Sequence, residues 1–235
     1  MREYLQYKIL EIIFNSKYAQ DLIFLGGTAL RIVYNNSRFS EDLDFDNFSL
    51  TPEQFIDLAS EVKKKLELEG YEVEIKNVFK NAYRSYIRIP NILFDNDMSN
   101  LKEEKIMIQI DTLPHNFDYQ KDTKILNKFD VFSEIFVTPL DILLSQKINA
   151  ALNRRRAMGR DFYDIVFLLS LAKPNYGYLQ AKLGMGDAQT LRKRILESVR
   201  GFDFKELGRD VRPFLFDPDD SRKVVLFPEF IAQAP

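Results

Sequence analysis

One segment near the N-terminus, LIFLGGTALRIVYNNSRFSEDLDFD, constrains the fold more than any other part of the chain. It starts with a short apolar run, Leu22 to Leu25, of the kind that forms a buried strand. Gly26 and Gly27 then permit a tight turn, and Thr28 opens a short amphipathic helix. A polar loop leads from this helix to the acidic sequence DLDF. The order predicts a strand, a turn, a helix and a second strand.

The second strand of this segment carries two acidic residues with one position between them. Alternate side chains in a strand share a face, so Asp42 and Asp44 point the same way, while Leu43 and Phe45 point into a core. Two neighbouring carboxylates repel each other unless a cation neutralises them, and Mg²⁺ prefers oxygen ligands. Glycines allow a backbone to approach a phosphate closely. The segment therefore predicts a site for a metal ion and a phosphate.

Composition narrows the class of protein. Hydrophobic residues make up 46% and charged residues 29% of the chain, as in soluble globular proteins with a real core. No apolar run is long enough to cross a membrane and the charged start is unlike a signal peptide, so we expect a cytoplasmic protein. The absence of cysteine excludes disulfides and thiolate sites, and a single histidine excludes a multi-histidine zinc centre. Any metal ion is then held by carboxylates.

A third acidic residue stands in the later strand-like run KIMIQIDTLP. Ile106, Ile108 and Ile110 face one side of this run, and Met107, Gln109 and Asp111 face the other. A two-metal phosphoryl-transfer site generally needs more than two carboxylates. Asp111 is the candidate for the third one; the alternative is that it only ends a strand.

The remaining elements follow from periodicity and capping. The N-terminal segment to about Ala19 reads as a helix, and a second helix starts at the capping box of Thr51 and ends at Gly70. Strand-like runs follow at 71–78, 83–89 and 105–113. These elements predict a small mixed sheet covered by helices.

The pattern changes at Thr138-Pro139-Leu140-Asp141, which resembles another capping box. Helical periodicity dominates after it, and we expect an irregular strap in the Pro- and Asp-rich tail from Pro213. We therefore predict two domains, residues 1–137 and residues 138–235.

The sequence GGTALR followed by RFSEDLDF resembles the first motif of the AbiEii/AbiGii toxin family, within the polymerase β-like nucleotidyltransferase superfamily. The resemblance extends over most of the first 170 residues. It implies an α+β fold, in which a nucleotidyltransferase domain with a mixed sheet and helices precedes a C-terminal helical domain. It also implies metal ligands at Asp42, Asp44 and Asp111, and contacts to the bound nucleotide from Gly26, Gly27, Thr28, Arg38 and Ser40.

The resemblance continues into the predicted helical domain. Lys147 matches a helix lysine that contacts the triphosphate in the family, and Asp161 and Asp164 match an Arg-Asp-x-x-Asp motif needed for activity. Asp161 and Asp164 share a helix face by spacing. The structural alternative is an ordinary solvated helix face, with Asp161 as a cap or dipole partner.

The function implied is the transfer of NMP from an NTP to an acceptor hydroxyl, with Mg²⁺ as cofactor. The family implies an RNA acceptor, first of all a tRNA 3′ end, and a cognate antitoxin, in a toxin–antitoxin or abortive-infection system. The net charge of −2 argues against a surface that coats nucleic acid, but the basic runs 154–156 and 192–194 can supply local phosphate contacts. Their spacing fits RNA, protein or small-molecule acceptors equally.

Rival functions explain less of the sequence. A phosphatase Asp-x-Asp follows an apolar strand, whereas Asp42 follows a polar loop, and a glycosyltransferase leaves the glycine turn unexplained. A nucleotide- or RNA-binding module without turnover, and a purely structural protein, stay as alternatives. Asp46 is peripheral to the acidic pair, and His115, which has no partner motif, reads as a loop residue.

Overall fold

The computed structural model describes residues 1–80, 82–114 and 116–233, so the expectation for His115 lies outside the described residues. The chain forms two compact units. The first comprises residues 1–29 and 41–138; the second comprises residues 30–40 together with the chain from Pro139 onward. Residues 30–40, which lie between the glycine pair and Asp42 in the sequence, thus belong to the second unit.

The first unit is built on a seven-stranded mixed sheet with the order β3-β4-β5-β2-β1-β7-β6. The pairs β2–β5 and β1–β7 are parallel, and the other neighbours are antiparallel. The strands are β1 Leu22–Leu25, β2 Leu43–Asn47, β3 Glu74–Phe79, β4 Tyr83–Ile89, β5 Ile106–Pro114, β6 Asp122–Lys128 and β7 Val131–Val137. The prediction of a mixed sheet is confirmed, but β6 and β7 were not predicted.

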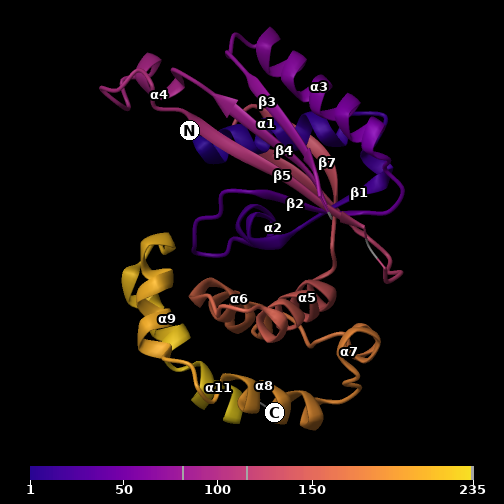
Figure 1. Cartoon of the computed structure of the whole chain (residues 1–235), viewed down its shortest axis with the longest axis vertical. Coiled ribbons are helices and arrows are strands. Elements are labelled where there is room, and N and C mark those ends of the chain that lie inside the picture. The colour runs from indigo at the N-terminus through magenta and orange to yellow at the C-terminus, as the bar shows by residue number, and fades with distance from the viewer. Residues whose placement is uncertain (81, 115, 234–235) are drawn as a thin grey trace. The chain divides into compact units, whose positions relative to one another are not determined.

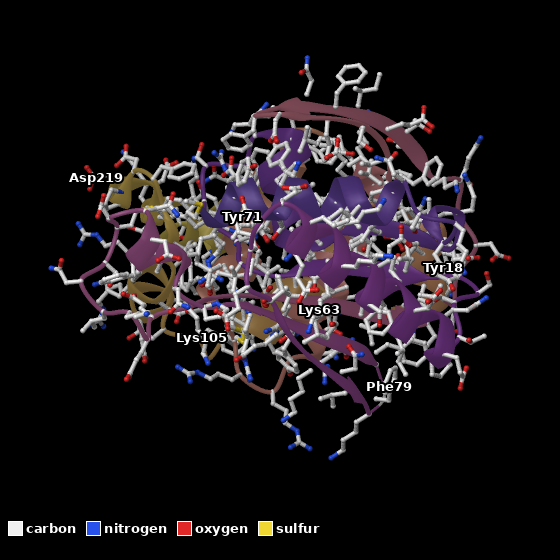
Figure 2. All side chains as sticks on the ribbon, turned by 90° about the horizontal axis from the view of Figure 1, so that it is seen from above. Tyr18, Lys63, Tyr71, Phe79, Lys105 and Asp219 are labelled. Carbon is white, nitrogen blue, oxygen red and sulfur yellow. The ribbon has the colours of Figure 1, made fainter. Side chains whose placement is uncertain are left out.

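Two helices of the first unit, α1 (Arg2–Phe14) and α3 (Pro52–Leu68), pack together and against the sheet (Figure 1). Phe55 of α3 contacts Tyr83 of β4, and Phe14 of α1 contacts Phe45 of β2, so both helices cover the face that carries the odd-numbered residues of β2 and β4. Phe79 lies at the tip of β3 beside Tyr83 (Figure 2).

The start of α3 follows the predicted capping box. The Thr51 hydroxyl accepts from the Gln54 backbone N–H and the Gln54 side chain accepts from the Thr51 N–H, with Pro52 at the first helical position. The first helix, by contrast, ends at Phe14, five residues before the predicted end. A short helix, α4 (Ile92–Asp95), and a 3₁₀ turn, η1 (Ala19–Asp21), complete the first unit.

The second unit is helical, as predicted (Figure 1). Helix α2 (Gly26–Tyr34) starts in the first unit and contributes its last residues to the second. The other elements are α5 Leu140–Asn153, α6 Gly159–Leu169, α7 Tyr176–Leu183, α8 Ala188–Val199, α9 Phe204–Val211, η2 Arg212–Phe214, η3 Pro218–Ser221, α10 Arg222–Val225 and α11 Phe227–Gln233. No helix among the described residues is both long and apolar enough to span a membrane.

Two details of this region differ from the prediction. Thr138 does not cap α5: Pro139 holds the N-cap position, and the buried Thr138 hydroxyl lies 2.9 Å from the Tyr119 hydroxyl. The described tail, up to Gln233, is a series of short helices and not an irregular strap, because Val224, Phe227 and Ile231 bury an apolar face.

Candidate active site

The register of the sheet places the two principal acidic residues side by side. Asp44 on β2 is the direct partner of Asp111 on the parallel strand β5. Leu25 of β1 pairs with Asp44 on one side, and Arg84 of β4 pairs with Asp111 on the other. We call Asp42, Asp44 and Asp111 the carboxylate row. Asp44 and Asp111 lie on the face opposite α1 and α3, because their neighbours Phe45 and Ile110 point to those helices.

Gly26 ends the strand beside this row. Its φ of +80° is in the left-handed region, which favours glycine. A Cβ on Gly26 would collide with Oδ2 of Asp44, so only glycine leaves room for that carboxylate. Helix α2 starts at Gly26, and the first N–H groups of a helix favour an anion. Gly26 thus forms the tight turn predicted for the glycine pair, and the contact of the two glycines with a phosphate stays a prediction.

Thr28 and Asp42 are tied together. The Thr28 hydroxyl donates to the backbone carbonyl of Asp42 at 2.5 Å. This bond fixes the first turn of α2 against the start of the acidic strand. Asp42 itself precedes β2, which begins at Leu43, so it does not sit in the strand as predicted. Asp46 is buried and accepts from the Tyr119 hydroxyl at 2.6 Å, in agreement with a peripheral place.

Asp111 is held through one oxygen only. Its Oδ2 accepts from Arg84 Nε and from Gln109 Nε2, both at 3.1 Å. Its Oδ1 is buried and has no hydrogen-bond partner among residues 1–80, 82–114 and 116–233. A buried carboxylate oxygen without a partner is costly unless a cation or water satisfies it.

The ligand atoms of the carboxylate row and their spacing show how well this site suits a divalent cation. Hard oxygen ligands suit Mg²⁺, and Oδ1 of Asp111 is a ligand atom that lacks a partner. Among the described residues, however, no three acidic, histidine or cysteine side chains stand grouped closely enough to hold a metal ion as they are. The oxygen donors of the carboxylate row fit Mg²⁺ by their chemistry, and the side chains would have to rotate to converge on one ion.

The second unit contains a buried charge cluster around Asp164, which is fully buried. Arg38 donates to it from Nε at 2.5 Å and from Nη2 at 2.6 Å, and Asn36 donates from Nδ2 at 3.0 Å. Burial raises the pKa of Asp164, but Arg38 and Lys147 outweigh that effect and lower it to about 2. The placement of Arg38 favours a structural part over the predicted phosphate contact, since Asp164 and the Phe39 carbonyl occupy its guanidinium.

Lys147 and Asp161 belong to the same cluster. Lys147 Nζ lies 2.8 Å from Oδ2 of Asp164 and 4.0 Å from Oδ1 of Asp161. Arg154 Nε lies 3.1 Å from Oδ2 of Asp161. The residues predicted from the third and fourth motifs are therefore brought together, with both aspartates almost completely buried.

Helix α6, which carries both aspartates, starts where another helix approaches closely. A Cβ on Gly159 would collide with the backbone carbonyl of Leu207 in α9. The Gly159 N–H donates to Asp210 Oδ2 at 2.9 Å. Gly159 thus fixes the position of α6 within the second unit.

The structure therefore gathers the predicted residues in two groups, one in each unit. Sequence reasoning assigned no role to Arg84, Gln109 or Asn36. The role of Gln109 was detectable, because strand alternation in the sequence already placed it on the same strand face as Asp111, two positions before it. Arg84 and Asn36 are far from their partners in the sequence, and no local pattern indicates them. Ser40 stands half-buried in the segment that joins the second unit.

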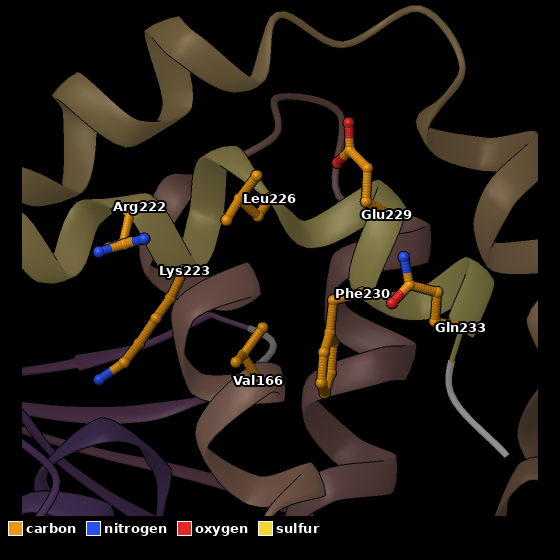
Figure 3. Close-up of a pocket in the computed structure, with 7 residues that line it drawn as sticks. All are labelled: Val166, Arg222, Lys223, Leu226, Glu229, Phe230 and Gln233. Atoms are coloured by element: carbon orange, nitrogen blue, oxygen red, sulfur yellow. The ribbon is translucent and has the colours of Figure 1, made fainter.

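The second unit also contains a pocket of about 510 Å³ (Figure 3). Its lining consists of Val166, Arg222, Lys223, Leu226, Glu229, Phe230 and Gln233. No residue of the predicted site is among these lining residues. The pocket is therefore distinct from the charge cluster.

Comparison with known proteins identifies a family that the chain matches. Residues 8–220 match the family described as "Nucleotidyl transferase AbiEii toxin, Type IV TA system". No curated protein sequence matches the chain.

Solved structures with the same fold include JHP933 from Helicobacter pylori, with a TM-score of 0.59 and 16% identity, covering 98% of this chain and 90% of that one. The nucleotidyltransferase toxin MenT4 (Rv2826c) from Mycobacterium tuberculosis H37Rv has a TM-score of 0.55 and 16% identity, covering 99% of this chain and 83% of that one. At this identity the likeness shows the fold.

Proposed function

Because this chain belongs to the AbiEii nucleotidyltransferases, the toxins of type IV toxin–antitoxin systems, we propose that it transfers NMP from an NTP to an RNA 3′ end, with tRNA as the first candidate. The family membership confirms the resemblance drawn from the sequence. The reaction forms a bond from the acceptor oxygen to the α-phosphorus, breaks the bond to the β-phosphate oxygen, and releases pyrophosphate.

The observation that carries the proposal is the pairing of Asp44 with Asp111, beside a glycine that leaves room for the Asp44 carboxylate. Asp42, Asp44 and Asp111 would hold Mg²⁺ through carboxylate oxygens. When bound, Mg²⁺ supplies charge neutralisation for the triphosphate and lowers the pKa of the acceptor hydroxyl.

The protein's own groups bind and orient the nucleotide. The backbone N–H groups of Gly26, Gly27 and Thr28 at the start of α2 are suited to phosphate oxygens. In the second unit, Lys147 and Asp161 are proposed as residues required for activity, because the lysine offers a positive charge for a triphosphate and the aspartate orients its neighbours. Transfer needs no covalent enzyme intermediate, so the lack of cysteine is no obstacle.

The test is incubation of the purified protein with Mg²⁺, total tRNA and each α-³²P-labelled NTP in turn, beside an Asp44→Asn variant. We expect label in RNA with one NTP, and at least a 100-fold loss in the variant, the magnitude typical of removing a preorganised electrostatic contact. A second variant, Asp46→Asn, removes a neighbouring carboxylate that is engaged with Tyr119 and should keep most of the activity.

Other outcomes point to the alternatives. Label in protein or in a small molecule, lost in Asp44→Asn, would keep the transferase chemistry and overturn the RNA acceptor. Nucleotide binding that depends on Mg²⁺, without label in any acceptor, would favour a binding module without turnover. Neither the transferase nor the binding module requires a contact with a cognate antitoxin. Co-purification of the protein with its antitoxin tests that partner separately.

A further inference from the structure

The face of the sheet that carries the carboxylate row extends over β5, β4 and β3. Ring contacts of Phe55 in α3 with Tyr83 and Phe79 show that the odd-numbered residues of β3 and β4 face the helices. The even-numbered residues of β3 and β4 therefore line the opposite face, together with the odd-numbered residues of β5. These residues are Glu74, Lys76, Val78, Arg84, Tyr86, Arg88, Met107, Gln109, Asp111 and Leu113.

The register orders these side chains into rows. Arg84 pairs with Asp111, so β4 enters this face directly beside the carboxylate row. Tyr86 pairs with Gln109 on one side and with Lys76 on the other. The next row contains Arg88 and Met107. We call Lys76, Tyr86 and Arg88 the β4 platform.

The β4 platform is accessible and its side chains are not used to hold the fold. Lys76 is exposed, and Tyr86 and Arg88 are half-buried. Within the described part of the chain, the side chains of Tyr86 and Arg88 make no hydrogen bond or ion pair. These three side chains do not resemble residues of a packed core. In a core, a tyrosine hydroxyl normally has a hydrogen-bond partner, which Tyr86 lacks within the described residues.

The part of this face that lies on β3 and β4 carries more positive than negative charge, which suits a polyanion. Lys76, Arg84 and Arg88 contribute three positive charges there, against one negative charge from Glu74, the partner of Arg88; Asp111 and Asp44 lie on the neighbouring strands β5 and β2. Asp111 belongs to the carboxylate row. A cation bound there adds to the positive side of the balance. An aromatic ring flanked by basic side chains is the combination with which proteins bind single-stranded nucleic acid.

We propose that the β4 platform binds the unpaired 3′ end of the RNA acceptor, with Tyr86 stacking on a base and Lys76 and Arg88 contacting phosphates. The inference rests on the proposed transferase function and names the part of the acceptor that the site recognises. Tyr86 of the platform pairs with Gln109, the neighbour of Asp111 on the same face of β5, so a strand lying along the platform can end at the carboxylate row. An acidic peptide would use the cations but not the half-buried ring of Tyr86, which makes a protein ligand the poorer fit.

The test measures binding without turnover. A fluorescein-labelled 12-nucleotide single-stranded RNA is titrated with full-length protein in the absence of NTP, and the dissociation constant is read by anisotropy at several salt concentrations. Tyr86→Ala should weaken binding about tenfold, within the range found for base–aromatic stacking. Tyr86→Phe keeps the ring and should bind like the native chain.

Charge variants give results of opposite sign. Arg88→Ala should weaken binding and reduce the slope of log K against log salt by about 0.7, the value for one contact to single-stranded phosphate. Glu74→Gln removes a negative charge beside Arg88 and should tighten binding. Lys63→Ala on α3 (Figure 2) and Phe132→Ala on β7 alter an exposed lysine and an exposed ring elsewhere in the first unit, and should leave binding unchanged.

Two results would overturn the proposal: unchanged RNA affinity in Tyr86→Ala and Arg88→Ala, or equal losses in the Lys63 and Phe132 controls. The transferase function is judged separately by labelling with Asp44→Asn, so labelled RNA together with unchanged platform variants would refute the platform alone. A platform that binds RNA in a chain that labels nothing would refute the transferase alone. Thermal unfolding of each variant identifies any loss caused by misfolding.

Discussion

Gly26 lies against the carboxylate of Asp44, so closely that any Cβ at Gly26 would overlap Oδ2 of Asp44. The close approach depends on the positive φ of Gly26, which turns the chain from β1 into α2. A glycine at this position is therefore required twice, by the backbone and by the neighbouring acid. The relationship links the glycine motif to the acidic motif, which stand 18 residues apart in the sequence (44 − 26).

Gly26→Ala should reduce nucleotidyl transfer by about 100-fold or more, because the new methyl group displaces Asp44 from its place beside Asp111. It should also destabilise the fold by about 1–3 kcal/mol through strain and overpacking. Steady-state transfer assays and urea unfolding measure the two effects. Gly70→Ala is the matched control: Gly70 also has a positive φ, but a Cβ there meets nothing within 4 Å. Equal activity losses in both variants would mean that strain alone, and not the collision with Asp44, is responsible.

Arg84→Met should strengthen the binding of Mn²⁺, used in place of Mg²⁺, by about two- to fivefold. The guanidinium competes with a cation for Asp111, and a partly exposed pair of this kind is worth roughly 0.5–1 kcal/mol. Electron paramagnetic resonance of free Mn²⁺ during a titration gives the affinity. Arg88→Met, four residues further along β4 and on the same face, should leave the affinity unchanged. Weaker binding in Arg84→Met would show instead that Arg84 orients Asp111 for the cation.

Local sequence patterns were sufficient to predict several elements of the first unit. The apolar run before Gly26, the capping box at Thr51 and the alternation around Asp111 each specify an element through its own residues. The hairpin of β6 and β7 lacked such a signal. Its turn places Phe129 at a φ of +57°, a conformation that hairpin turns normally give to glycine or asparagine. Strand β6 is also an edge strand, with polar residues at most positions.

The contacts of the candidate site also fall into two kinds: those that a local sequence pattern predicts and those that only the tertiary fold creates. The face shared by Asp44 and Asp111 follows from strand alternation and the family pattern, but the ion pair of Arg38 with Asp164 joins residues 126 apart. Only the tertiary fold brings them together. For the same reason the sequence indicated a phosphate contact for Arg38, whereas the structure buries its guanidinium against Asp164.

Asp164→Asn should lower the free energy of unfolding by about 3–5 kcal/mol, because it leaves Arg38 and Lys147 without their buried counter-charge. The contribution of Asp164 should also depend on pH. Its pKa falls from 3.8 to about 2 in the folded state, so the carboxylate stabilises the fold fully above pH 3.8, and this stabilisation is lost as the pH falls towards 2. Urea unfolding of both proteins should therefore give a difference that is constant near neutral pH and shrinks between about pH 4 and pH 2.

An exposed ion pair provides the comparison for this variant. Asp57 also pairs with a lysine, Lys17 at 3.1 Å, and hydrogen bonding from Tyr18, followed by Lys17, lowers its pKa as well. Its side chain is 58% exposed, so water replaces the lost partner and Asp57→Asn should change stability far less. A loss in Asp57→Asn as large as that in Asp164→Asn would contradict the argument from burial. A stability difference for Asp164→Asn that stays constant down to pH 2 would show that the charge of Asp164 is not what holds the cluster together.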